Sequence, residues 1–160
     1  MNRYFIAIEI PEEIKKEIIS FFYPILTQNV IGNFVSPEKL HITVLFLGNV
    51  ELKPDILDFL KEIKFSEEIK IGGLGAFPSM HDPKIIYTKV SGNIKPIFHK
   101  LNSFLKIENR KEFIPHVTIC RAKKLIGKID ESEFESKEFT FTADSLHLFN
   151  SDFTNYYKIL

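Results

Sequence analysis

Two short segments of this chain each place a histidine and a threonine one residue apart. His41 and Thr43 stand in the run HITV, and His116 and Thr118 stand in HVTI. Because side chains alternate along a β-strand, each histidine and its threonine would share one face, ~6–7 Å apart, while the apolar residues beside them point into a core. Neutral imidazole accepts a proton, imidazolium donates one, and threonine donates a hydrogen bond to a phosphoryl oxygen. Two such pairs facing each other predict an acid–base site around a tetrahedral anion.

The neighbouring sequence predicts the elements that position these pairs. Apolar, β-prone runs predict strands over residues 4–10, 40–47, 69–77, 85–90, 116–121, 139–149 and 156–160. Apolar residues at helical spacing predict helices that begin at Pro11, near Pro54 and after residue 93. Each histidine motif therefore begins a strand that follows another strand and a helix. This internal similarity predicts two related lobes.

The composition is that of an ordinary globular protein. The chain has 160 residues, of which 44% are hydrophobic and 26% charged, and its formal net charge is zero. These values exclude a disordered chain, and they predict one domain over residues 1–160. Cys120 is the single cysteine, which excludes a disulfide scaffold and indicates a reducing compartment. Since no run approaches the ~20 apolar residues of a membrane span, we expect a soluble, cytoplasmic protein that does not act at a membrane, and a monomer.

Positive charge is concentrated in residues 95–128, which contain nine Lys or Arg residues but only Glu108 and Glu112 as acids. Such an excess attracts anions such as phosphate or nucleic acid. The same composition also fits a solvated helix face followed by a loop. Composition alone does not decide between these two interpretations.

The two motifs and their flanks resemble a known group of enzymes. In order along the chain, RYFIAIEIPEE, SPEKLHITVLFLG, FIPHVTICRAKK and SLHLFNSDF are similar to segments of the 2H phosphoesterase superfamily, and within it of the RNA 2′,3′-cyclic phosphodiesterases, also called 2′-5′ RNA ligase-like proteins. The resemblance implies an α+β fold with two lobes, in which pseudo-two-fold duplicated antiparallel sheets with flanking helices surround a central cleft.

The resemblance also implies a role for each site residue. His41 matches the proton donor, His116 the proton acceptor, and Thr43 and Thr118 the hydroxyls that bind phosphate. Arg121 matches an arginine near the phosphate, although strict alternation would place it on the opposite face from His116. The implied reaction converts RNA 2′,3′-cyclic phosphate ends, or related nucleotides, to 2′-phosphomonoesters. It uses neither a metal nor a cofactor, and the sequence shows no cluster with the spacing of zinc ligands.

Three alternatives remain open at this point. Alternation places Cys120 on the same face as His116, which allows a cysteine hydrolase, but their Cα atoms would be ~13 Å apart, beyond hydrogen-bond reach. A non-catalytic RNA-binding module would use the basic segment and neither histidine. RNA ligation, the reverse reaction, would use the same residues. The other histidines are expected in a loop (His81), on a helix surface (His99) and on a partly exposed strand (His147).

Overall fold

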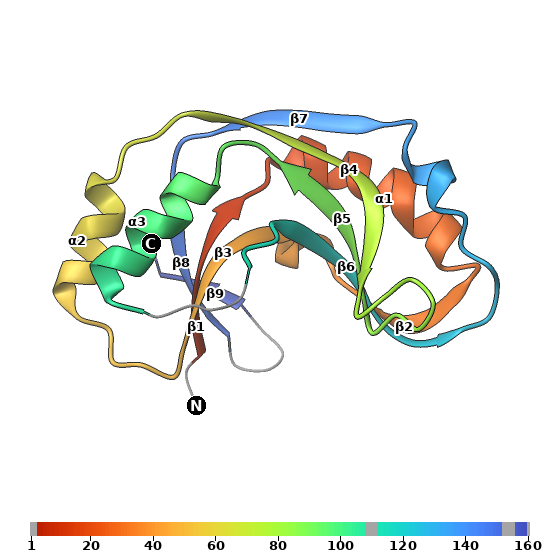
Figure 1. Ribbon diagram of the computed structural model, residues 1–160, viewed down its shortest axis with the longest axis horizontal. Helices are drawn as coiled ribbons and strands as arrows, with labels where there is room; N and C mark the ends of the chain where they lie inside the picture. Colours follow the sequence, from red (N-terminus) through yellow and green to blue (C-terminus); the bar gives the residue numbers. More distant parts are fainter. Residues whose placement is uncertain (1–2, 108–111, 152–155, 160) are drawn as a thin grey trace.

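The computed structural model describes residues 3–107, 112–151 and 156–159, which form two antiparallel sheets and three α-helices (Figure 1). The four-stranded sheet has the order β3-β1-β8-β9 and consists of β1 (Arg3–Glu9), β3 (His41–Gly48), β8 (His147–Ser151) and β9 (Tyr156–Lys158). The five-stranded sheet has the order β2-β6-β5-β4-β7 and consists of β2 (Val30–Phe34), β4 (Glu67–Phe77), β5 (Ile85–Ser91), β6 (His116–Leu125) and β7 (Glu138–Ala143).

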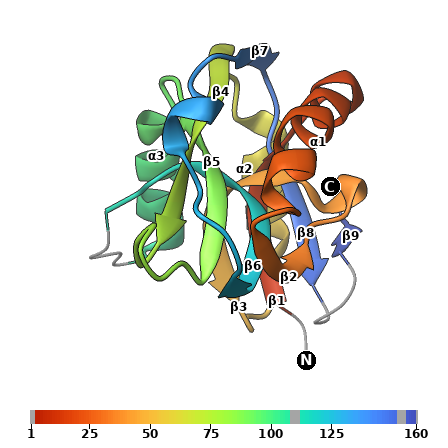
Figure 2. The ribbon, with the colours of Figure 1, turned by 90° about the vertical axis from the view of Figure 1, so that its right-hand side faces the viewer.

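The helices lie on opposite sides of the strands, as Figure 2 shows for α1 (Glu12–Leu26) and α3 (Lys95–Leu105). Helix α1 connects β1 of the four-stranded sheet to β2 of the five-stranded sheet, and it packs against β7 of the five-stranded sheet. Its Phe22 stacks on Phe134 at 5.4 Å between ring centroids. Helix α3 connects β5 to β6 but contacts β3, and it lies beside α2 (Pro54–Glu62) (Figure 1). Helix α1 therefore joins the two sheets, whereas α3 covers a sheet to which neither of the strands it connects belongs. Both helices thus link the two sheets. No described helix is long and apolar enough to cross a membrane.

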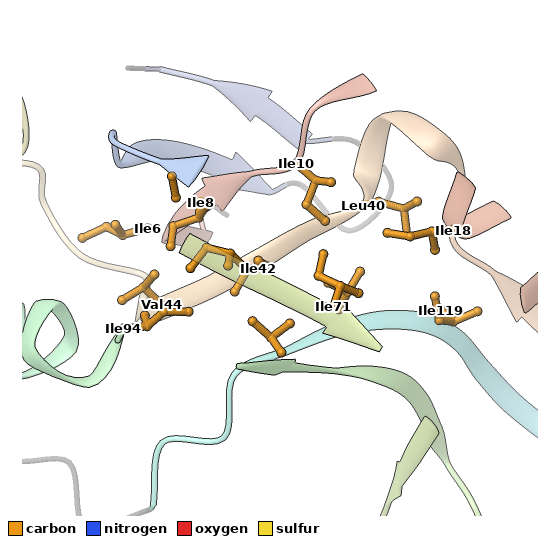
Figure 3. Close-up of a cluster of buried hydrophobic side chains, with 14 of the residues drawn as sticks. Ile6, Ile8, Ile10, Ile18, Leu40, Ile42, Val44, Ile71, Ile94 and Ile119 are labelled. Atoms are coloured by element: carbon orange, nitrogen blue, oxygen red, sulfur yellow. The ribbon is translucent and has the colours of Figure 1, made fainter. Parts of the chain in front are cut away.

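The apolar residues inside the histidine motifs anchor their strands in the core. Ile42 and Val117, each directly after a motif histidine, are fully buried. Figure 3 shows Ile42 and Val44 of β3 within a cluster that also contains Ile71 of β4 and Ile119 of β6. Both sheets thus contribute to one hydrophobic cluster, and burial of these side chains removes apolar surface from water, the main favourable contribution to folding.

The architecture confirms the implied α+β fold with two duplicated antiparallel sheets, and most of the predicted elements are present. Residues 139–149, predicted as one strand, are instead β7 and β8 in different sheets, because the polar pair Asp144 and Ser145 interrupts the apolar run. Strand β2 was not predicted, since Gly32 and Asn33 weaken its β-character. Strand β6 extends four residues beyond the predicted end, and residue 160 lies outside the described residues.

Candidate active site

Both histidine motifs begin a strand that contains the same irregularity. In β3, Thr43 and Leu45 pair with consecutive residues of β1, so Val44 is an extra residue and forms a β-bulge. In β6, Ile119 is the extra residue in the same way. A bulge shifts the alternation by one, so residues beyond it change face. The two strands accordingly share one burial pattern. The histidine and threonine of each motif are half-buried, the two residues after the threonine are buried, and the next residue is exposed.

The bulge brings Arg121 to the same side of β6 as His116. Strict alternation placed these residues on opposite faces, and that expectation was wrong because it assumed a regular strand. Arg121 lines the cleft together with His116 and Thr118. In β3, Phe46 holds the equivalent position three residues after its motif threonine, is 71% exposed and also lines the cleft. The two lobes therefore present a cation on one side and an aromatic ring on the other.

The same bulge turns Cys120 into the core. The expectation that Cys120 shares a face with His116 was wrong, because Cys120 is fully buried and packs over Gly32 of β2. Burial raises the pKa of the Cys120 thiol to about 11. Since the thiolate is the nucleophile, a thiol that stays protonated at neutral pH is unreactive. The cysteine-hydrolase alternative therefore lacks both the geometry and the charge state that it needs.

One cleft of about 680 Å³ brings together all five site residues expected from the sequence, which come from both sheets: His41, Thr43, His116, Thr118 and Arg121. Arg3 and Lys39 also line it, and none of its described lining residues is an Asp or a Glu. An excess of cationic side chains along a cleft attracts an anionic ligand. In the described part of the chain, no group of three or more His, Cys, Asp or Glu side chains could hold a metal ion.

The two motif histidines have matching backbone contacts. Nδ1 of His41 donates to the carbonyl oxygen of Lys39 at 2.6 Å, and Nδ1 of His116 donates to that of Ile114 at 2.8 Å. Since a carbonyl oxygen only accepts, both neutral rings carry their proton on Nδ1. Nε2 is then the atom that can gain or lose a proton. In His41 it accepts a hydrogen bond from the Thr43 hydroxyl at 2.8 Å.

The environment of His41 favours the neutral imidazole. The pKa of His41 is lowered from 6.5 to about 4, mainly by burial and also by the positive charges of His116 and Lys15, whereas the hydrogen bond to Lys39 acts in the opposite direction. His116 is thus close enough to His41 to influence its charge. An anion in the cleft would act in the opposite direction, because a neighbouring negative charge stabilises the imidazolium.

Each motif histidine packs against aromatic rings of its own sheet. The His41 ring lies 4.9 Å from Phe5 of β1, between centroids. The His116 ring lies 5.2 Å from Phe77 and 5.1 Å from Tyr87. Tyr87 lies flat on Gly75, where an added Cβ would come within 2.6 Å of the ring. Both Phe5 and Tyr87 are buried. This packing restricts the orientation of the two imidazoles.

The remaining histidines lie outside the cleft, as expected. His81 is in a loop, His99 is exposed on α3, and His147 of β8 is half-buried, with Nε2 3.1 Å from the hydroxyl of Ser145. The basic segment is divided between α3 and β6, and in its described part Arg121 is the residue that lines the cleft. The described part of this segment therefore does not form one cationic surface at the site.

Sequence reasoning missed Arg3 and Lys39 as cleft residues. A signal for each was present. Arg3, Phe5 and Ala7 alternate along one strand and so share a face, and Lys39 immediately precedes the strand that begins with a motif histidine.

Comparison with known proteins identifies the class. The chain superposes on the crystal structure of E. coli LigT complexed with 3′-AMP with a TM-score of 0.75 at 21% identity, covering 99% of this chain and 95% of that chain, so the two share a fold. The family model "LigT like Phosphoesterase" matches residues 8–87. The chain therefore belongs to the LigT-like phosphoesterases, a family of enzymes, and the resemblance stated from the two motifs is confirmed.

Two relatives define the position within the family. A protein of Methanocaldococcus jannaschii is 32% identical over 162 aligned positions, covering 90% of this chain and 92% of its own length. A protein of Aquifex aeolicus is 33% identical over 128 positions, covering 72% of this chain and 64% of its own length. Both are named RNA 2′,3′-cyclic phosphodiesterase.

Proposed function

We propose that this chain hydrolyses the 2′,3′-cyclic phosphate ends of RNA to 2′-phosphomonoesters. The observation that carries the proposal is the pair of His–Thr motifs, one from each sheet, which line a single cationic cleft. The names of its relatives support the substrate class, and so do the crystal structures of E. coli LigT with 3′-AMP and with phosphate.

His116 is the general base in this mechanism. Its Nε2 takes a proton from a water molecule, whose oxygen attacks phosphorus. The Nδ1–H bond to the Ile114 carbonyl keeps the ring in the tautomer that leaves Nε2 unprotonated, and it stabilises the imidazolium that forms. The bond between phosphorus and the 3′ oxygen then breaks, which leaves the phosphate on the 2′ oxygen.

His41 is the general acid, and it donates the Nε2 proton to the departing 3′ oxygen. A depressed pKa makes its imidazolium a stronger acid, and the bound phosphate supplies the negative charge that allows the ring to become protonated. Once Nε2 carries a proton it no longer accepts from Thr43, so that hydroxyl is released to donate to the phosphate. Each proton transfer of this kind contributes roughly 10²–10⁴-fold to the rate.

The other site residues stabilise the phosphoryl charge. Thr118 donates to a non-bridging oxygen from the second lobe, and Arg121 supplies a fixed positive charge from the same strand. Charge stabilisation of this kind is most effective when the donors are already in place. Because side chains supply both proton transfers and the charge stabilisation, the mechanism requires no metal ion.

The test is to incubate the protein with RNA oligonucleotides that end in a 2′,3′-cyclic phosphate, in the presence of EDTA, and to assign the product by phosphorus NMR. We expect a 2′-phosphomonoester as the product. A 3′-phosphomonoester would contradict the assigned leaving group, and complete loss of activity that zinc restores would contradict the metal-free mechanism. RNA binding without turnover would favour the binding module instead.

A further inference from the structure

The cleft extends along β1 away from the two histidines. Arg3, Phe5 and Ala7 alternate along this strand and lie on the face that carries the motif, because Ala7 is opposite Thr43. Arg3 is four residues from Ala7, which corresponds to ~13 Å of extended strand. Arg3 nevertheless lines the same cleft as His41 and Thr43. The cleft is therefore longer than a single phosphate needs.

A row of aromatic side chains separates Arg3 from the catalytic motif. Phe5 lies opposite Phe46 of β3 and Phe149 of β8. Its ring is 6.1 Å from that of Phe46 and stacks on that of Phe149 at 5.2 Å, between centroids. The floor of this lobe is consequently apolar between the site of the reacting phosphate and Arg3. A nucleoside fits such a surface better than a second anion does.

Beyond the aromatic row the cleft becomes polar again. Arg3 is exposed. In the strand register it lies opposite Ser151 of β8, which also lines the cleft. Gly48, on the opposite strand, has a φ of 73°, and among the described residues no atom beyond its two chain neighbours lies within 4 Å of the position that a Cβ would occupy. In the described part of the chain, this end therefore combines a cation and a hydroxyl with a backbone that no side chain covers at Gly48. These features suit a phosphate group.

We propose that Arg3 binds the phosphodiester on the 5′ side of the terminal nucleotide. A nucleoside 2′,3′-cyclic phosphate carries one phosphate, whereas an RNA end carries a second one on the 5′ oxygen of the same ribose. With the cyclic phosphate between the histidines and the nucleoside over the aromatic row, that second phosphate faces Arg3. Arg3 thus makes this phosphoesterase selective for strand ends over free cyclic nucleotides. The inference rests on the proposed function for its substrate.

The test compares three substrates: adenosine 2′,3′-cyclic phosphate, its 5′-phosphorylated form, and an adenosine dinucleotide with the same cyclic end. For the wild-type protein we expect a higher kcat/KM on the second and third. Arg3→Gln should lower kcat/KM about tenfold on those two and leave the first unchanged, because it removes one hydrogen-bonded charge. Arg3→Lys should retain most of the preference. Lys100→Met, which removes an exposed cation of α3 outside the cleft, should behave like the wild type.

A binding measurement separates this inference from the proposed function. Calorimetry with adenosine 3′-phosphate and adenosine 3′,5′-bisphosphate needs no turnover, and we expect tighter binding of the bisphosphate that Arg3→Gln abolishes. If the wild type hydrolysed none of the substrates, the proposed function would be wrong. The difference in affinity between the bisphosphate and the monophosphate would still test the role of Arg3. An equal effect of Arg3→Gln on all ligands, or no effect, would overturn the inference.

Discussion

The low pKa of His41 predicts that this one side chain makes the fold sensitive to acid. In the unfolded chain the pKa of His41 has its ordinary value of 6.5, whereas in the folded protein, mainly because of burial, the pKa is about 4. Between these values the unfolded state binds more protons, so the free energy of unfolding falls as the pH falls. At pH 5 the loss from this residue is ~2 kcal/mol relative to pH 8, and it approaches ~3 kcal/mol below pH 4.

The perturbation is His41→Gln, which keeps a polar side chain beside Lys39 and Thr43 but does not titrate. Urea unfolding at pH 5 and pH 8 gives the free energy of unfolding of each variant at each pH. We expect the fall between pH 8 and pH 5 to be ~2 kcal/mol larger in the wild type than in His41→Gln. His99→Gln, at an exposed position on α3, should keep the wild-type difference. An equal fall in the wild type and His41→Gln would refute the reasoning.

Three further predictions concern the reaction. The inflection set by the general acid His41 should lie near its pKa of about 4 in the kcat/KM profile, which reports the free enzyme, and should move to higher pH in the kcat profile, because the bound phosphate favours the imidazolium; coincident inflections would contradict this. Arg121→Gln should lower kcat/KM on every cyclic phosphate by about tenfold or more, since it removes a charge beside the reacting group. Steady-state kinetics on a mononucleotide measure this loss, and an unchanged kcat/KM would contradict the prediction. Cys120→Ala should leave turnover unchanged while thermal unfolding reports a cost of ~1 kcal/mol for the small cavity, and lost turnover in a folded variant would reopen a role for the thiol.

The sequence was sufficient to predict the duplicated elements and the convergence of both motifs on one cleft. Strong periodicity explains this success, because the strands around His41 and His116 alternate clearly up to their threonines. The packing of α3 against the sheet to which neither of its neighbouring strands belongs was not predicted. It depends on which sheet each apolar helix face reaches in three dimensions, and spacing along the chain contains no such information.

The position of Arg121 shows where strict alternation failed. A bulge depends on the register between neighbouring strands, which one strand does not specify by itself. A local signal was nevertheless present in both motifs, since two apolar residues follow each motif threonine in succession (Val44 with Leu45, and Ile119 with Cys120). In a regular strand the second of each pair would face the cleft. The bulge instead buries both, and it exposes the residue that follows.

The central claim is that His41 and His116 act together as acid and base on one phosphate. The most direct test is kcat/KM for adenosine 2′,3′-cyclic phosphate, measured for His41→Ala, His116→Ala and the double variant, with binding of adenosine 3′-phosphate as a control for the fold of the cleft. We predict that each single variant loses most of its turnover, that the double variant loses less than the product of the two single losses, and that binding is far less affected. Full turnover in both single variants would contradict the account.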